Sequence, residues 1–130
     1  MINLTRIRNI NVRQPATEQE ASQVALKLKK QFSEEYQRFL LQTNGFDADF
    51  LRLYPLDELC EMNKCYEAQD YCPDFFAIGD DGGGRAILIK DQSLQDNRIF
   101  LVDHGSMDPD DMEVIGQDLV TWLESGCPLP

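Results

Sequence analysis

Few residues of this 130-residue chain have side chains and spacings that could support catalysis. The run Gly82-Gly83-Gly84 lies between two apolar stretches and follows Asp80 and Asp81, whose charges would repel a phosphate. A phosphate-binding loop instead joins a strand to a helix and continues with Lys and then Ser or Thr. The five-position oxygen pattern of a calcium-binding loop is also missing. These features predict a hairpin turn in which the glycines adopt positive φ angles.

His104 is the only histidine, so a metal site built from several histidines is excluded. It follows Asp103, but adjacent residues of a strand point to opposite faces, and no nucleophile motif such as Gly-x-Ser-x-Gly accompanies them. We therefore predict no catalytic residue, no metal and no cofactor. An enzyme that uses Asp80, Asp81 and His104 is the alternative that these residues leave open.

The four cysteines form no Cys-x-x-Cys pair, and no apolar signal segment stands at the N-terminus. This pattern predicts reduced, structural thiols in a cytoplasmic protein, at Cys60, Cys65, Cys72 and Cys127.

The net charge narrows the class of partner. Twelve Lys and Arg against 23 Asp and Glu give −11, which argues against nucleic acid or an anionic membrane as a partner. Residues 1–38 carry a net charge of +3 and residues 39–130 a net charge of −14. Between Asp103 and Asp118 no Lys or Arg neutralises the carboxylates. That stretch is either a solvated loop or a surface that complements a basic protein cleft.

On the second interpretation, the carboxylates would attract a basic protein, and exposed aromatic side chains near them would supply the affinity. Phe46 lies in similarly acidic surroundings and is a further candidate anchor. The predicted partner-binding residues are Asp80, Asp81, Asp103, Asp108, Asp110, Asp111, Glu113, Tyr66 and Tyr71.

Hydrophobic spacing and capping residues predict the helices. Thr17 and Glu20 have the spacing of a capping box, and Ser33 precedes two glutamates at the start of a second helix that ends at Asn44-Gly45. Asp57 is expected to cap a third helix that runs to about residue 66.

Strands are predicted from apolar runs at residues 50–54, 75–79, 86–89 and 98–102, with a weaker strand or extended arm in residues 1–16 that Pro15 ends. The apolar runs are uninterrupted, which indicates strands buried on both faces, so we expect helices to cover the sheet. Residues 108–123 allow two interpretations. One is a single helix capped by Asp108, and the other is an extended stretch from Met112 to Ile115 followed by a helix from Asp118.

The order of these signals resembles a known family over about residues 17–126. The run 32–40 with Asn44-Gly45, the strand and glycine turn 75–84, the run 102–105 and the closing run 118–123 resemble the SUKH superfamily of Smi/Knr-type domains. The resemblance implies one α+β domain over residues 1–130, with a mostly antiparallel sheet of about four to six strands flanked by helices. It also favours the interpretation in which the last helix begins at Asp118.

Many bacterial members of this superfamily are immunity proteins that bind and block a cognate toxin, often a nuclease. The resemblance therefore implies a non-enzymatic immunity protein whose partner is a toxin domain with a basic surface. A cytosolic interaction or regulatory module without a toxin partner is the alternative.

Overall fold

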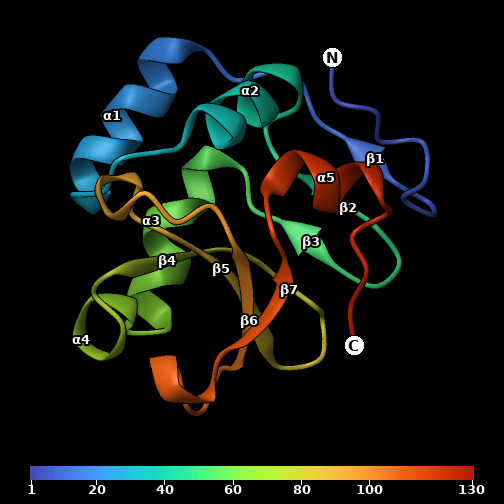
Figure 1. The fold of residues 1–130 in the computed structure, drawn as a ribbon. Helices are drawn as coiled ribbons and strands as arrows, with labels where there is room; N and C mark the ends of the chain where they lie inside the picture. Colours follow the sequence, from blue (N-terminus) through green and yellow to red (C-terminus); the bar gives the residue numbers. More distant parts are fainter.

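A computed structural model describes all residues from Met1 to Pro130. Seven strands form one antiparallel sheet, in which each strand pairs with the next one along the chain (Figure 1). The strands are β1 (Asn11–Val12), β2 (Phe46–Asp47), β3 (Arg52–Leu53), β4 (Phe75–Asp80), β5 (Arg85–Lys90), β6 (Ile99–Asp103) and β7 (Glu113–Gly116). The predicted α+β class is confirmed. The sheet exceeds the expected four to six strands because it also includes β2, whose two residues are too few to leave a pattern of alternation.

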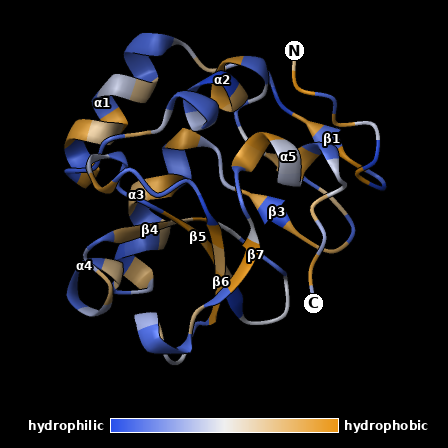
Figure 2. Cartoon of the chain, in the orientation of Figure 1, coloured by the Kyte–Doolittle hydropathy of each residue, from blue (hydrophilic) through white to orange (hydrophobic).

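Residues of β4, β5 and β6 form the centre of the hydrophobic core. Their apolar residues are buried whether they point to one face or to the other, as in Ala86 to Ile89 of β5. On one face the ring of Phe76 stacks on Phe32 at 5.3 Å and lies 5.9 Å from the ring of Tyr36. Figure 2 shows the hydrophobic colour concentrated on β5 and β6, with hydrophilic residues on the outer helices. The expectation of a sheet covered on both faces is therefore correct.

Five helices surround the sheet, and three of their predicted caps are confirmed. The Thr17 hydroxyl accepts from Glu20 N–H while the Glu20 carboxylate accepts from Thr17 N–H, completing the capping box. Ser33 and Asp118 cap two further helices. The helices are α1 (Glu18–Leu28), α2 (Glu34–Gln42), α3 (Leu56–Cys65), α4 (Ala68–Tyr71) and α5 (Leu119–Glu124), with short 3-10 turns η1 (Gln92–Leu94) and η2 (Pro109–Asp111).

The cap of α3 differs from the prediction. The helix begins one residue before Asp57, at Leu56. The Leu56 N–H, which has no partner within the helix, donates to the side-chain oxygen of Asn44 at 2.9 Å. Gly45 follows with φ +76°, and a Cβ there would meet the Leu53 carbonyl oxygen at 2.4 Å. Asn44-Gly45 therefore forms the turn after α2 and also supplies the cap of α3 from a distant part of the chain.

The two chain ends also refine the prediction. The N-terminal strand is only Asn11–Val12, and Ile2 and Ile7 are buried in the core instead. The Gln42 side chain holds the Ile2 backbone, accepting from its N–H and donating to its C=O, each at 2.8 Å.

At the other end, the interpretation with a strand before Asp118 is the correct one, and Asp108 caps the short turn η2. Gly116 in β7 leaves room for Trp122, because a Cβ there would lie 3.0 Å from that side chain.

Asn63 closes an open edge of the sheet. β3 pairs only with the end of β4, at Gly79 and Asp80, so the first half of β4 has no neighbouring strand on that side. Asn63 of α3 makes the hydrogen bonds that a neighbouring strand would make. The Asn63 side-chain oxygen accepts from Ala77 N–H at 2.7 Å, and the Asn63 side-chain NH2 donates to the Ala77 C=O at 2.9 Å. Asn63 is 7% exposed, so water cannot substitute for it freely.

Replacing Asn63 by alanine should therefore destabilise the protein by about 2–4 kcal/mol, because two buried backbone groups lose their partners. Urea unfolding followed by circular dichroism measures this loss. Asn97→Ala is the matched control, since Asn97 is exposed and should leave the midpoint unchanged. Equal midpoints for the two variants would contradict the role assigned to Asn63.

Candidate functional site

The predicted partner-binding residues gather at one end of the sheet. The β4–β5 turn and the loop after β6 meet there, because His104 N–H donates to the Gly84 C=O at 2.8 Å. In Figure 1 this turn and η2 both lie in the lower part of the view. Between this loop and the end of α3 with α4 runs an open groove of about 440 Å³, lined by Cys65, Tyr66, Glu67, Tyr71, His104, Gly105, Ser106 and Met107.

Asp80 and Asp81 build the glycine turn. Asp80 accepts from Gly82 N–H at 2.9 Å, and Asp81 accepts from the N–H groups of Gly83 and Arg85 at 2.8 and 3.0 Å. The Arg85 guanidinium donates to the other Asp81 oxygen at 2.7 Å. Burial alone would raise the pKa of Asp81, but these backbone and guanidinium donors hold it below its ordinary value. Only 7% of the Asp81 side chain is exposed, so its carboxylate serves the turn.

A chain of hydroxyl groups connects this turn to α3. The Tyr54 hydroxyl donates to Asp80 at 2.6 Å, and the Tyr66 hydroxyl lies 2.6 Å from that of Tyr54. Because a tyrosine has one hydroxyl hydrogen, Tyr66 must be the donor in the second bond. Burial, reinforced by the bond to Asp80, raises the pKa of Tyr54, and burial raises the pKa of Tyr66. Both hydroxyls are therefore neutral at physiological pH.

His104 packs against this chain of hydroxyls. Its ring stacks on that of Tyr66 with 4.3 Å between centroids, and its Nε2 is buried without a hydrogen-bond partner. Residue spacing could not reveal this arrangement, because Tyr54, Tyr66, Asp80 and His104 come from four separate segments of the chain.

The carboxylates of the β6–β7 loop and β7, by contrast, point to solvent. Asp103, Asp108, Asp110, Asp111 and Glu113 are all exposed, and none forms an ion pair. Asp103, Asp108 and Asp111 order the loop, since they accept from Gly105 N–H, Asp110 N–H and the Ser106 hydroxyl. No Lys or Arg occurs after Arg98 in the sequence. The segment Asp103–Glu113, called the acidic loop below, is thus both negatively charged and internally hydrogen-bonded.

The three candidate aromatic anchors have different environments. Tyr71, at the end of α4, is 57% exposed and lines the groove. Tyr66 is half-buried and shows the groove only part of its ring. Phe46 is fully buried against Phe39, with 5.9 Å between ring centroids, so it cannot be an exposed anchor. Tyr71 is therefore the aromatic side chain available to a partner at this end.

The structure groups no three His, Cys, Asp or Glu side chains in an arrangement that could hold a metal ion. All four cysteines are free thiols. Burial raises the pKa of Cys72 to about 11 and that of Cys127 to about 12, so these two thiols are protonated and unreactive. No helix is long and apolar enough to cross a membrane.

Comparison with known proteins agrees with this architecture. The model of the SMI1 / KNR4 family (SUKH-1) matches residues 15–125. The chain belongs to the SMI1/KNR4 (SUKH-1) family. A curated relative, described as "Uncharacterized protein YnaB" of Bacillus subtilis (strain 168), is 34% identical over 80 residues. That match covers 61% of this chain and 54% of the relative, so it spans about half the length of that protein.

The family match bears out the sequence resemblance, which covered about residues 17–126. It spans all five helices completely and all but the first strand of the sheet. Both the acidic loop and the groove beside it therefore lie within the SUKH-1 domain.

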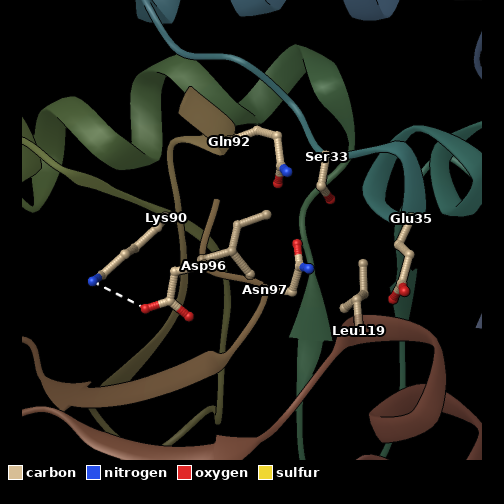
Figure 3. Close-up of a pocket in the computed structure, with 8 residues that line it drawn as sticks. Ser33, Glu35, Lys90, Gln92, Asp96, Asn97 and Leu119 are labelled. Atoms are coloured by element: carbon tan, nitrogen blue, oxygen red, sulfur yellow. Dashed lines mark ion pairs between the residues drawn. The ribbon is translucent and has the colours of Figure 1, made fainter. Parts of the chain in front are cut away.

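A small concavity of this SUKH-1 domain has a structural role. It lies between β5, the η1 connection and the starts of α2 and α5, and its volume of about 10 Å³ admits roughly one water molecule (Figure 3). In it Lys90 pairs with Asp96 at 3.1 Å, and Asp96 also binds Arg98 at 2.7 Å. Nearby, the Glu35 carboxylate accepts from Val120 N–H at 2.8 Å. The Lys90–Asp96 pair therefore fastens the β5–β6 connection to β5, and the Glu35 bond fastens α5 to α2.

The Asp96 pairs should make stability depend on pH. The Arg98 side chain, followed by that of Lys90, holds the pKa of Asp96 below its ordinary value despite partial burial. A depressed pKa contributes stability above the ordinary carboxyl pKa, and this stability is lost as the pH falls through the folded-state pKa. At pH 7, Asp96→Asn should lower the urea midpoint by roughly 0.5 M, and the difference from wild type should shrink below about pH 4.

Asp70→Asn is the control for this measurement, because Asp70 is exposed and forms no hydrogen bond or ion pair through its side chain. A difference between wild type and Asp96→Asn that stays constant down to pH 2 would show that the ion pairs are not its cause.

Proposed function

We propose that this protein is an immunity protein that binds a toxin domain with a positively charged surface and blocks it without catalysing a reaction. Membership of the SUKH family supports this proposal, because SUKH domains are commonly immunity proteins. The observation that carries it is the concentration of exposed, unpaired carboxylates on an ordered loop at one end of a rigid sheet. A nuclease must hold a polyanion, so its active-site cleft is basic and complementary to such a loop.

Charge and shape have different tasks in this proposal. Carboxylates in solvent steer the encounter and raise the association rate by about 10- to 1000-fold at low salt. They add little affinity once they are screened. The exposed Tyr71 ring beside the groove supplies an apolar anchor that a partner can desolvate.

The environment of the polar residues supports binding over catalysis. Asp81 is neutralised by Arg85, Asp80 accepts from Tyr54 and Gly82, and His104 stacks on Tyr66. An enzyme that relied on Asp80, Asp81 and His104 would have to break bonds that hold the turn and α3 together. Alanine at all three positions tests this alternative, and activity lost in a variant that still folds would favour it.

The direct test is protection of cells. If a toxin domain is encoded beside this gene, co-expression of this protein should restore growth of cells that produce the toxin, and the purified pair should associate more slowly as salt increases. A protein that binds no such domain and has no toxin gene beside its own would instead support a general interaction module. Binding that is independent of salt would remove the electrostatic part of the proposal.

Reversing two loop charges should slow association selectively. The double variant Asp110→Lys, Asp111→Lys should lower the association rate about tenfold at low salt, with little change in dissociation, and the effect should fade as salt is added. Surface plasmon resonance measures both rates. The matched control is Asp57→Lys, Glu61→Lys on α3, which changes the net charge equally at exposed positions away from the loop.

Removing the aromatic anchor should raise the dissociation rate of the complex rather than lower its association rate. Tyr71→Ala should raise the dissociation rate of the toxin complex about tenfold or more, because a desolvated ring is lost from the interface. The unfolding midpoint should stay close to wild type, since the ring is 57% exposed. Leu94→Ala, at a 47% exposed residue of η1, is the control. Unchanged dissociation in Tyr71→Ala would exclude this tyrosine from the interface.

A further inference from the structure

A second groove carries the opposite charge to the acidic loop. It lies between the C-terminal end of α1, the last turns of α3, α4 and the start of β4, and it has a volume of about 320 Å³. Figure 1 shows α1, α3 and α4 on the same side of the molecule, away from β7. The half-buried Leu28 gives it an apolar floor, next to which Phe75 and Phe76 are almost fully buried. The lysines Lys27, Lys29, Lys30 and Lys64 also line it.

The concentration of lysine here is unusual for so acidic a chain. Four of the five lysines in the sequence line this groove, and no Asp or Glu lines it. None of the four forms an ion pair, whereas the fifth, Lys90, pairs with Asp96. Two helix C-termini lie nearby, and each offsets about half a positive charge. Even with this offset, the residues that line the groove carry an excess of positive charge around an apolar floor.

Lys29 adds to this charge at a conformational cost. It ends α1 with φ 58°, in the left-handed conformation that glycine adopts most easily. A glycine would serve the helix end better, so the lysine is not explained by the backbone.

The arrangement of the charges defines the ligand. The lining has no arginine fork, and the helix end beside it presents carbonyl groups, so the groups that usually grip a single phosphate are missing. Lys27, Lys29 and Lys30 lie at the end of α1, and Lys64 lies on α3. Charges spread in this way match carboxylates spaced along a chain, and the floor between them accepts an apolar side chain.

We propose that this groove binds an acidic peptide segment of a second protein partner, with Asp and Glu side chains on the lysines and an apolar residue on the floor. The site is separate from the acidic loop and does not depend on a toxin partner. With both surfaces, the protein would bridge a basic partner and an acidic one.

The test uses a capped synthetic peptide of Asp and Glu residues with two leucines at its centre, titrated into the full-length 15N-labelled protein at low salt. Amide shifts should move at residues 27–30 and 60–69 and not at residues 103–113. Lys27→Gln and Lys64→Gln should each weaken binding about two- to fivefold. Arg8→Gln, an exposed charge outside the groove, should leave binding unchanged.

Lys29→Gly separates a binding role from a structural one. It should weaken peptide binding while raising the thermal midpoint, because glycine relieves the left-handed residue. A peptide with serine in place of leucine should bind more weakly, and inorganic phosphate should cause no matching shifts.

Three outcomes would overturn the proposal. These are no shifts in the groove, equal binding by the lysine variants, or phosphate binding as strong as that of the peptide. Sedimentation of the protein alone distinguishes a second copy as the occupant: self-association that Lys64→Gln abolishes would replace the peptide with another molecule of this chain.

Discussion

The burial of β4, β5 and β6 on both faces is the constraint on which the rest of the structure depends. Strands buried in this way must be covered by other elements, and their free edges must be closed without water. Asn63 closes the edge of β4 beyond β3, and the aromatic residues before and within α2 cover Phe76. Helices therefore occupy the faces of the sheet, and charged loops are confined to its ends.

This arrangement explains why the acidic loop can be ordered and still remain available. The turn of Asp80 and Asp81 satisfies its own charges through backbone N–H groups and Arg85, and Tyr54 anchors it to the interior. The loop after β6 is held against that turn by the hydrogen bond from His104 N–H to the Gly84 C=O. Its carboxylates bind the backbone of the same loop, so they stiffen it without being neutralised.

Local signals in the sequence predicted much of the fold. The caps at Thr17, Ser33 and Asp118 act within one helical turn, and the strands around the glycine turn are long enough to show their apolar pattern. Contacts between distant residues could not be predicted in this way. Asn44 caps α3 from twelve residues away, and Asn63 pairs with Ala77 across fourteen. The sequence likewise gives Tyr71 and Phe46 similar acidic surroundings, although one is exposed and the other is fully buried.

The order of the strands bears on how the molecule acquires its structure. Every strand pairs with its immediate successor, and the four longest strands are joined by short connections. Pairings between neighbours in the sequence lose little chain entropy on closure, and proteins of low contact order fold quickly. Each hairpin from β4 onward can therefore form from a continuous stretch of chain, without waiting for the N-terminal and C-terminal segments to pack.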